Sequence, residues 1–570
     1  MVQRLPLDAF YQRETTHPHK RYMVQPQVGG QIEELSWAQV GNQARRAAAW
    51  LRAQELEPGS RIAIISKNCA HWIIADLAIW MAGHVSVPLY PNLTAESVRQ
   101  ILEHSESVLA FIGKLDDWPA MSGGVPEGVP TVGLPLRPAG RFDSLWSDLQ
   151  AFEPISDNPQ PAADQLATII YTSGTTGMPK GVMHTFANFG YTGSQAVELF
   201  DVGADDRVLS YLPLCHVAER MFVQMVSIYA GQSIFFAESL DTFVHDIRRA
   251  RPTVFFGVPR IWGKFQMGVF SKLPPKKLDR LLKIPFLGRV MARKVLAGLG
   301  LDAVRYAMSG GAPVPDALVD WYQRLGLEIL EVYGMTENCG YSHVGRPGSR
   351  KSGWIGQSNP GVDVRISEQG EVQVRSGSVT QGYYKQPQLT AETITEDGFL
   401  RTGDKGEQDG DGYLRLTGRI KEIFKTSKGK YVAPAPIENR LAAHSEIEQV
   451  CVVGDGLPQP IALCVLSEAG RKELRESLQG SLVELLERIN DSLDKHERLR
   501  ALIVIDDVWA VENGFLTPTL KIKRAVIEGV YGPRFHEWME YGTPVHWHDE
   551  SDKSHTQERS HGNLASNPQS

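Results

Sequence analysis

Two kinds of apolar run alternate along the first half of the chain. The strings "RIAIIS", "CAHWIIADLAIWMAG" and "VSVPLY" follow one another between residues 61 and 90, and they predict a strand, a helix and a second strand. Apolar, β-branched runs that end in loops predict further strands at residues 166–172, 252–258 and 328–334. This order predicts an α/β fold with a parallel sheet, in which ligands collect beyond the carboxyl ends of the strands. The loops after these strands are therefore expected to converge on one crevice.

The pattern changes after about residue 360. Short strands with glycine turns are expected at "GVDVRI", "GEVQVRSG" and "GYLRLTGRI", and a second unit follows with the strands "IEQVCVVG" and "ALCVLS" and the helix "SLVELLERINDSL". The polar segment after about residue 551 has no apolar periodicity, which indicates a disordered tail. We therefore predict a large N-terminal α/β domain at residues 1–417 and a hinge at 418–421. A small mobile α+β C-terminal domain at 422–550 and a disordered tail at 551–570 are expected to follow.

Composition narrows the class of protein. The 570 residues carry a net charge of −7, which argues against a nucleic-acid-binding role for the whole chain. The five cysteines form no CxxC pair, so neither a zinc site nor a disulfide framework is expected, and a reducing compartment is favoured. The N-terminus lacks the apolar region of a signal peptide. The most apolar stretch contains Asp76, His84 and Pro88, which favours a buried helix and strand over a membrane span. We expect a cytoplasmic protein.

The loop "YTSGTTGMPKG" (171–181) combines hydroxyls, glycines and a lysine, as phosphate binding requires. It is not a Walker A loop, because Lys180 follows a proline and precedes a glycine instead of a Ser or Thr in a helix. An ordinary Ser/Thr/Gly turn would have a similar composition. The loop alone therefore predicts a phosphate site without naming the reaction.

Further strings match one family in order along the chain. They are "SGGAPV" (309–314), "YGMTE" (333–337), "LRTGD" (400–404), "GRIKEIFK" (418–425) and "LKIKR" (520–524). Together with the loop they resemble the adenylate-forming enzymes, a superfamily of acyl-CoA synthetases, luciferases and peptide-synthetase adenylation domains. "LPLCHVAER", "KTSKGKYVAP" and "LTPTLKIKR" are most similar to the long-chain fatty-acid–CoA ligase branch. Such enzymes join a carboxylate to AMP from ATP, release pyrophosphate and then exchange AMP for a thiol.

The resemblance implies a role for each matching residue in ATP and Mg²⁺ binding. Thr172 and Glu337 are the expected Mg²⁺ contacts, and Glu337 and Thr336 are expected at the reacting phosphate. Asp404 and Arg419 are expected to hold the ribose, although an interdomain ion pair would also explain Arg419. The remaining expected ATP-binding residues are Ser173, Gly174, Thr175, Thr176, Gly177, Lys180, Gly310, Gly311, Ala312, Tyr333 and Gly334.

The C-terminal matches imply one lysine for the adenylation step and another for the thioester-forming step. In an extended segment Lys521 and Lys523 would share one face, so alternation does not choose between them. The family's catalytic lysine lies three residues before an arginine, which Lys521 satisfies with Arg524, although Leu520 replaces a glycine common in the wider superfamily. Lys421 matches the hinge and Lys425 a residue of the thioester-forming step. His216 resembles an acyl-pocket residue or is a buried structural histidine.

A basic stretch lies outside these motifs. Residues 248–294 contain thirteen Lys and Arg residues and one acid, Asp279, with apolar residues between them. Contact with an anionic membrane, binding of the coenzyme A phosphates and a solvated helical face are all compatible with this pattern. A membrane contact would make the enzyme peripheral to the inner membrane face.

The expected function is ATP-dependent, Mg²⁺-requiring ligation of a fatty acid, of long chain length, to coenzyme A. A carrier-protein phosphopantetheine could replace coenzyme A as acceptor, or another acid could replace the fatty acid. A scaffold protein that only binds ATP is disfavoured because the loop, Glu337 and Lys521 are all present.

Overall fold

The computed structural model describes residues 4–172, 179–511, 513–517 and 520–548. The predicted tail at 551–570 lies outside these residues. The chain forms two compact units, Met1–Thr402 with Glu407–Arg415, and Gly403–Gly406 with Leu416–Ser570. The expected fold class, a large α/β unit with a smaller C-terminal unit, is confirmed. The movement of the smaller unit about residues 418–421 stays a prediction.

The first sheet of the larger unit has eight strands. Its order is β19 (Gly382–Tyr383), β9 (Lys180–Thr185), β8 (Leu166–Thr172), β4 (Val85–Leu89), β3 (Arg61–Ile65), β5 (Ser107–Ile112), β6 (Thr131–Gly133) and β7 (Ser144–Leu145). The strands from β8 to β7 are parallel, as predicted for residues 61–90, and β9 and β19 add an antiparallel edge. This edge positions the end of the hydroxyl-rich loop.

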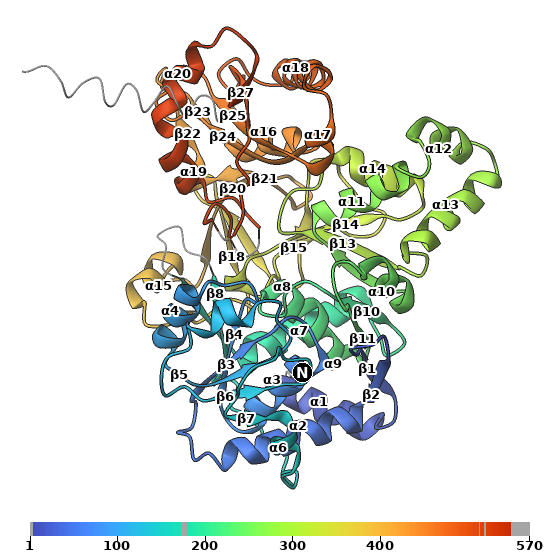
Figure 1. The fold of residues 1–570 in the computed structure, drawn as a ribbon, viewed down its shortest axis with the longest axis vertical. Coiled ribbons are helices and arrows are strands. Elements are labelled where there is room, and N and C mark those ends of the chain that lie inside the picture. The colour runs from blue at the N-terminus through green and yellow to red at the C-terminus, as the bar shows by residue number, and fades with distance from the viewer. Residues whose placement is uncertain (1–3, 173–178, 512, 518–519, 549–570) are drawn as a thin grey trace, which may run out of the picture. The chain divides into compact units, whose positions relative to one another are not determined.

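Alternating side chains explain why helices cover both faces of this sheet. Ile62 and Ile64 of β3 pack in one core cluster, whereas Ala63 and Ile65 pack in another on the opposite face. The first cluster contains α1 (Pro6–Thr16), α2 (Trp37–Arg52), α3 (Ala70–Met81), α6 (Trp146–Gln150), α7 (Phe186–Phe200) and α9 (Val226–Ala230) (Figure 1). The second contains α4 (Ala95–Ser105) and α5 (Trp118–Ser122). Every residue of α3 is buried. None of the described helices combines the length and the apolar character that crossing a membrane requires.

The second sheet has nine strands. They run in the order β12 (Val254–Gly257), β13 (Tyr306–Gly310), β14 (Ile329–Tyr333), β15 (His343–Val344), β16 (Gly356–Ser358), β21 (Tyr413–Arg419), β20 (Leu400–Gln408), β18 (Glu371–Arg375) and β17 (Asp363–Ile366). The first three strands are parallel. One face of them packs against α7 and α9, and the other against α10 (Phe243–Ala250), α11 (Pro259–Phe270), α12 (Pro275–Leu282), α13 (Leu287–Leu299) and α14 (Asp316–Arg324). Helices α7 and α9 therefore contribute to the cores of both large sheets.

Smaller elements complete this unit. A four-stranded sheet has the order β10 (Arg207–Ser210), β11 (Ser233–Phe236), β1 (Arg21–Pro26) and β2 (Ile32–Ser36). Helix α15 (Pro387–Thr393) follows β19. Helix α8 (Val217–Glu219) continues through η1, a π-helix at Arg220–Met225, into α9. A turn of η2 (Thr336–Asn338) follows β14.

The smaller unit is built around a four-stranded sheet in the order β24 (Ile447–Val453), β25 (Ile461–Leu466), β26 (Leu502–Ile505) and β27 (Val545–His548). One face packs against α16 (Pro434–Leu441) and α18 (Arg475–Asp491), and the other against α19 (Arg524–Tyr531) and α20 (Phe535–Glu540). The remaining elements are η3 (Ile420–Glu422), β22 (Phe424–Lys425), β23 (Tyr431–Val432), α17 (Glu468–Lys472) and η4 (Gly532–Arg534). Alternate residues of β25 face the two cores, which explains its unbroken apolar sequence.

A fully buried ion pair ties η1 to the first sheet. Nη2 of Arg220 lies 2.6 and 2.7 Å from the two carboxylate oxygens of Asp76 in α3, and both side chains have no exposed surface. Arg220 also donates to the hydroxyls of Ser86 in β4 and Thr168 in β8, at 3.0 and 3.1 Å. Gln224, one turn further along, donates to Asp76 at 2.6 Å. Because a buried charge needs such partners, this network fixes η1 against three other elements.

We expect Asp76→Asn to destabilise the larger unit by about 3–5 kcal/mol, because the buried Arg220 charge would lose its counter-charge. The double variant Asp76→Asn/Arg220→Met should recover part of this loss, since it removes both charges. Thermal and denaturant unfolding of the three proteins measures the effect. A double variant that is less stable than the single one would contradict this account.

Candidate active site

The β8–β9 hairpin carries both ends of the hydroxyl-rich loop. Thr172 ends β8 and Lys180 begins β9, and the two residues pair across the antiparallel strands. The Thr172 hydroxyl lies 3.5 Å from the Lys180 carbonyl oxygen, so it is only weakly engaged. The predicted phosphate-binding residues between these strands lie outside the described residues; they are Ser173, Gly174, Thr175, Thr176 and Gly177.

Tyr383 joins this hairpin to the acid predicted to hold Mg²⁺. Its hydroxyl donates to Oε1 of Glu337 at 2.7 Å, and both side chains are buried. The Lys180 ammonium lies 5.9 Å from the centroid of the Tyr383 ring, and β19 places Tyr383 beside Val182 of β9. The structure thus brings Lys180, Tyr383 and Glu337 into one cluster, although no sequence motif points to Tyr383. The tyrosine pair in "QGYYKQP" was the available signal.

The turn after β14 requires glycine. A Cβ atom on Gly334 would lie 2.5 Å from the carbonyl carbon of Gly340, which no side chain tolerates. Oδ1 of Asn338 accepts a hydrogen bond from the backbone N–H of Met335 at 2.9 Å. Thr336 and Glu337 lie between these residues in η2. The turn is therefore closed on itself and holds both predicted residues at the carboxyl end of the sheet.

His184 of β9 fixes the same turn from the neighbouring sheet. It is fully buried, and burial lowers its pKa to about 4, so the ring is neutral at pH 7. Nε2 donates to the carbonyl oxygen of Thr336 at 2.8 Å, and the thiol of Cys339 lies 3.3 Å from Nδ1. The backbone N–H of Thr380 donates to the carbonyl oxygen of Glu337 at 2.7 Å. No sequence motif points to His184; a polar side chain at a buried position of the strand "KGVMHT" is its only local signal.

Two of the glycines predicted to bind ATP, Gly310 and Gly311, lie at the end of β13. Gly310 is the last residue of this strand, beside Val332 of the parallel strand β14, and an added Cβ would lie 2.6 Å from the Val332 carbonyl oxygen. Gly311 has a φ of 81°, which favours glycine, and Ala312 follows it. The ring of Tyr333, at the end of β14, lies 6.0 Å from that of His343. These predicted residues therefore occupy the carboxyl ends of adjacent parallel strands, where ligands of α/β sheets bind.

The oxygen donors at this site suit Mg²⁺. Oε2 of Glu337 accepts no hydrogen bond from the described residues, while Tyr383 holds the other oxygen. No group of three or more His, Cys, Asp or Glu side chains in the described part of the chain could hold a metal by itself. Mg²⁺ commonly uses one or two carboxylates and takes its other ligands from substrate phosphates and water. One positioned carboxylate and the Thr172 hydroxyl fit that requirement.

His216 lies in a loop that other side chains hold rigidly. Its Nδ1 accepts from the backbone N–H of Ala218 at 3.2 Å and so caps α8. Asn68 binds the same loop by accepting from the Leu214 N–H at 2.9 Å. Glu219 accepts hydrogen bonds from three groups, and burial raises its pKa to about 8. This capping contact supports a structural role for His216, and its place in an acyl pocket stays a prediction.

In the smaller unit, Asp404 and Arg419 form an ion pair, with Nε of Arg419 3.0 Å from Oδ1 of Asp404. Both residues belong to this unit, so the pair does not link two units. Lys421 lies in η3, and Lys425 ends β22 with its ammonium 5.6 Å from the centroid of the Tyr431 ring. The two residues predicted to hold the ribose are therefore in contact.

The segment with the predicted catalytic lysine forms a turn. Leu520 has a φ of 61°, so the chain turns immediately before Lys521, and Ile522 then pairs with Leu516 in an isolated antiparallel bridge. The shared face expected for Lys521 and Lys523 stays a prediction. The N–H of Lys521 donates to Oγ1 of Thr517 at 3.1 Å, whereas Lys523 precedes α19 as its cap. Arg524 is anchored by Glu438 of α16, at 2.6 Å. Arg524 thus fixes the end of the turn, and burial, followed by the nearby Arg419 charge, lowers the pKa of the Lys521 ammonium.

Comparison with known proteins gives a consistent assignment. Residues 10–384 match the family described as AMP-binding enzyme, and residues 421–528 match the AMP-binding enzyme C-terminal domain. The long-chain-fatty-acid–CoA ligase FadD15 of Mycobacterium tuberculosis is 32% identical over 551 residues, covering 88% of this chain and 91% of the relative. The peroxisomal long chain acyl-CoA synthetase 6 of Arabidopsis thaliana is 30% identical over 570 residues, covering 87% and 80%.

Solved structures share the fold. The A domain of a carboxylic acid reductase from Segniliparus rugosus, in complex with AMP and a carboxylic acid, has a TM-score of 0.78 at 21% identity, over 94% of each chain. The O-succinylbenzoate coenzyme A synthetase of Bacillus subtilis, in complex with AMP, has a TM-score of 0.72 at 22% identity, over 91% of this chain and 97% of the other. The motifs, the fold and these matches agree, and the chain belongs to the AMP-binding enzyme family.

Proposed function

We propose that this protein is an AMP-forming ligase that joins a long-chain fatty acid to coenzyme A. The observation that carries the proposal is the cluster of Lys180, Tyr383 and Glu337 at the ends of the hydroxyl-rich loop. The names of relatives about 30% identical support the fatty acid and coenzyme A as substrates. The five cysteines are free and buried, which agrees with a cytoplasmic enzyme.

The proposed reaction has two steps. A carboxylate oxygen of the fatty acid attacks the α-phosphorus of ATP, and the bond to the β-phosphate oxygen breaks to release pyrophosphate. The sulfur of coenzyme A, having lost its proton, then attacks the acyl carbon and AMP leaves. The first step brings an anion to a polyanion, so fixed positive charges and dipoles must offset the repulsion.

The larger unit supplies these groups in the proposal. Lys180 neutralises the β- and γ-phosphates, and Glu337 and Thr172 hold Mg²⁺. When bound, Mg²⁺ supplies positive charge to the phosphate oxygens. Tyr383 keeps the Glu337 carboxylate in place by donating to one oxygen, and none of the described residues donates to the other. Tyr333, Gly310, Gly311 and Ala312 provide the adenine surface.

The smaller unit acts in both steps of the proposal. Asp404 and Arg419 bind the ribose, Lys521 stabilises the charge that develops during adenylation, and Lys425 serves the thioester-forming step. Lys421 is the hinge between the two arrangements. The turn that Arg524 fixes and the electrostatic interaction of the Lys521 ammonium with Asp404 and Arg419 support its assignment over Lys523.

Pyrophosphate release tests the overall proposal across fatty acids of increasing length, with and without coenzyme A. Each methylene that enters an apolar tunnel is worth about 0.8 kcal/mol, so kcat/KM should rise roughly four-fold per CH₂ until the tunnel ends. Acyl-CoA should accumulate with free coenzyme A. A preference for acetate or butyrate over palmitate would refute the long-chain assignment. Transfer of the acyl group only to a carrier-bound phosphopantetheine would show that coenzyme A is not the acceptor.

Tyr383→Phe tests the positioning of Glu337. The variant removes one hydrogen bond to a charged group, worth about 1.5–3 kcal/mol, so we expect adenylation to slow by roughly 10- to 100-fold and to need more Mg²⁺. Tyr384→Phe is the matched control, because the Tyr384 hydroxyl lies 3.2 Å from Glu106 and not at Glu337. Equal effects of the two changes on the Mg²⁺ dependence would rule out a positioning role.

Lys521→Ala should impair adenylation alone. Loss of one donor to developing charge typically costs about 10²–10³ in rate, so carboxylate-dependent ATP–pyrophosphate exchange should fall by that factor. Supplied acyl-AMP should still be converted to acyl-CoA. Lys523→Ala, two residues away, is the control and should keep the exchange activity; the reverse result would transfer the role to Lys523.

A further inference from the structure

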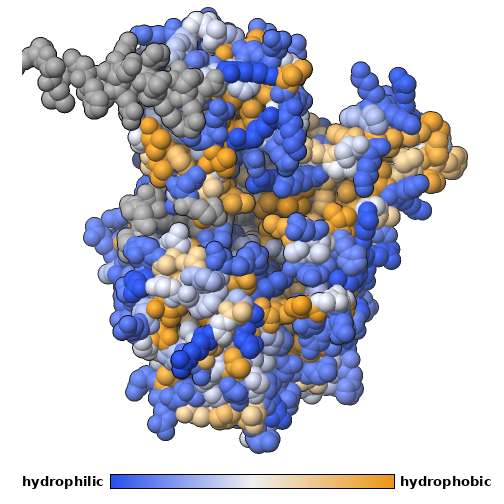
Figure 2. Space-filling model, viewed as in Figure 1, coloured by the Kyte–Doolittle hydropathy of each residue, from blue (hydrophilic) through white to orange (hydrophobic). Residues whose placement is uncertain are grey.

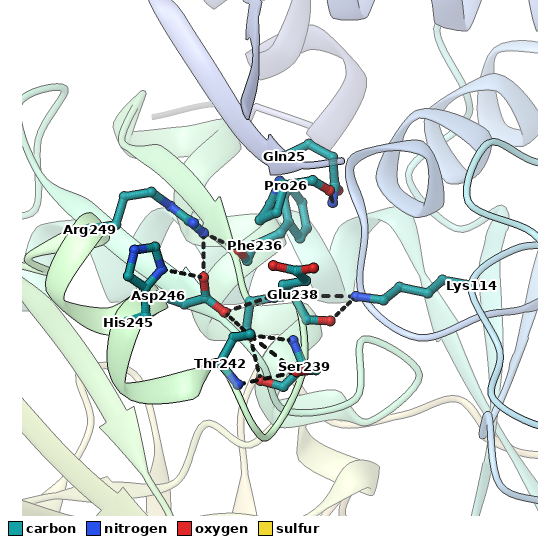
Figure 3. Close-up of polar contacts among 11 residues, drawn as sticks. Gln25, Pro26, Lys114, Phe236, Glu238, Ser239, Thr242, His245, Asp246 and Arg249 are labelled. Carbon is teal, nitrogen blue, oxygen red and sulfur yellow. Dashed lines mark hydrogen bonds and ion pairs between the residues drawn. The ribbon is translucent and has the colours of Figure 1, made fainter. Parts of the chain in front are cut away.

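The basic stretch at residues 248–294 has two structurally different parts. In and after α10, the arginines are used within the fold: Arg248 donates to the Gly298 carbonyl at 2.7 Å, and Arg251 pairs with Asp302 at 2.6 Å. Figure 3 shows Arg249 directed at the buried carboxylate of Asp246, at 2.8 Å. These side chains are held by structural contacts, so they do not form a free basic surface.

The second part is a helical hairpin whose basic side chains are exposed. We call residues 272–294, which contain α12 and most of α13, the basic hairpin. Its single acid, Asp279, is paired with Arg324 of α14 at 2.9 Å. Its eight basic residues are all exposed, and none forms an ion pair with another described residue; they are Lys272, Lys276, Lys277, Arg280, Lys283, Arg289, Arg293 and Lys294. The hairpin therefore presents a concentrated positive charge to solvent.

An apolar tip lies between these charges. Between residues 284 and 290 four large apolar side chains are exposed, namely Ile284 (45%), Phe286 (83%), Leu287 (42%) and Val290 (62%). Figure 1 shows α12 and α13 extending beyond α11 and α14, and Figure 2 shows an apolar surface at their outer end with hydrophilic side chains beside it. A cluster of this kind on a projecting element is typical of an interaction surface.

The backbone at the tip is strained at Phe286, whose side chain is exposed to solvent. Phe286 has φ 62° and ψ −51°, and the N–H of Leu287 donates to the Pro285 carbonyl at 2.7 Å. This is a γ-turn of the rare positive-φ form, which is unfavourable for a residue with a side chain. A Cβ on Gly288 would lie 2.3 Å from the Leu282 carbonyl oxygen, so the ends of the two helices are in close contact. The turn is consequently a compact, defined structure.

We propose that the basic hairpin docks the enzyme on an anionic lipid bilayer, with Phe286 and its apolar neighbours inserted at the boundary of the head groups and acyl chains. The eight cations meet anionic head groups, and the projecting apolar tip matches the apolar layer beneath them. A polyanion such as a nucleic acid would bind the basic side chains but would leave the apolar tip exposed to water. The inference rests on the proposed function, because a fatty acid in a bilayer would then lie at the surface that the enzyme binds.

Phe286→Gly separates docking from folding. Glycine relieves the positive-φ strain, so the melting temperature should stay equal or rise, whereas loss of the ring should weaken binding to phosphatidylglycerol vesicles by roughly 10-fold or more. Leu240→Gly is the matched control, because Leu240 is also 83% exposed but lies outside the hairpin. It should leave vesicle binding unchanged.

The charge requirement is tested by changing Lys276, Lys277, Arg280 and Lys283 together to Gln. Each cation adds roughly five-fold to binding at low salt, so binding should fall by more than about 100-fold and lose about half of its salt dependence, because four of the eight cations remain. Phosphatidylcholine vesicles should bind weakly with every variant. Turnover of a soluble substrate should not change, which distinguishes a failure of docking from a failure of the proposed function.

Three results would overturn the proposal. They are absence of wild-type binding to phosphatidylglycerol vesicles at low salt, equal binding by Phe286→Gly and the wild type, and a concentration-dependent dimer that Phe286→Gly disrupts without any vesicle binding. The last result, measured by sedimentation of the full chain, would assign the tip to self-association.

Discussion

A neutral histidine and a tyrosine hydroxyl hold the Thr336–Glu337 turn, and the arrangement of the phosphate region depends on these two contacts. His184 and Lys180 lie four residues apart on β9, and Tyr383 lies on the neighbouring strand β19. One edge of the first sheet therefore fixes both the lysine and the turn of the second sheet. Groups fixed in this way need little rearrangement when charge develops in a reaction, which is the general advantage of a preorganised site.

The burial of His184 determines which protonation state of its ring makes these contacts. A protonated His184 would carry a charge away from solvent, and burial lowers its pKa to about 4, so the neutral ring can both donate from Nε2 and accept at Nδ1. Below a pH of about 6.5 the unfolded chain binds a proton that the folded chain binds only near pH 4. The contribution of His184 to folding stability is therefore present at neutral pH and decreases as the pH falls through this range.

The sequence predicts those parts of the structure that depend on local pattern or on ordered motifs. The run "LATIIYT" corresponds to β8 over Leu166–Thr172, because a buried parallel strand is continuously apolar. Thr172, Lys180 and Glu337 were identified from motifs. Tyr383 and His184 were not, since their partners are 46 and 152 residues away in the chain and only the pairing of strands brings them together. The turn at Leu520 was missed because a positive φ at a leucine has no local signal.

The Arg220 network also constrains the order of folding events. Arg220 contacts side chains that precede it by 144, 134 and 52 residues, so its charge acquires partners only after three distant segments have met. Closing such long loops has an entropic cost before the contacts form. The guanidinium therefore lacks these partners until the three segments meet. Synthesis of the chain up to η1 is consequently a precondition for completing the core around α3, which cannot reach its final packing while the emerging chain still lacks Arg220.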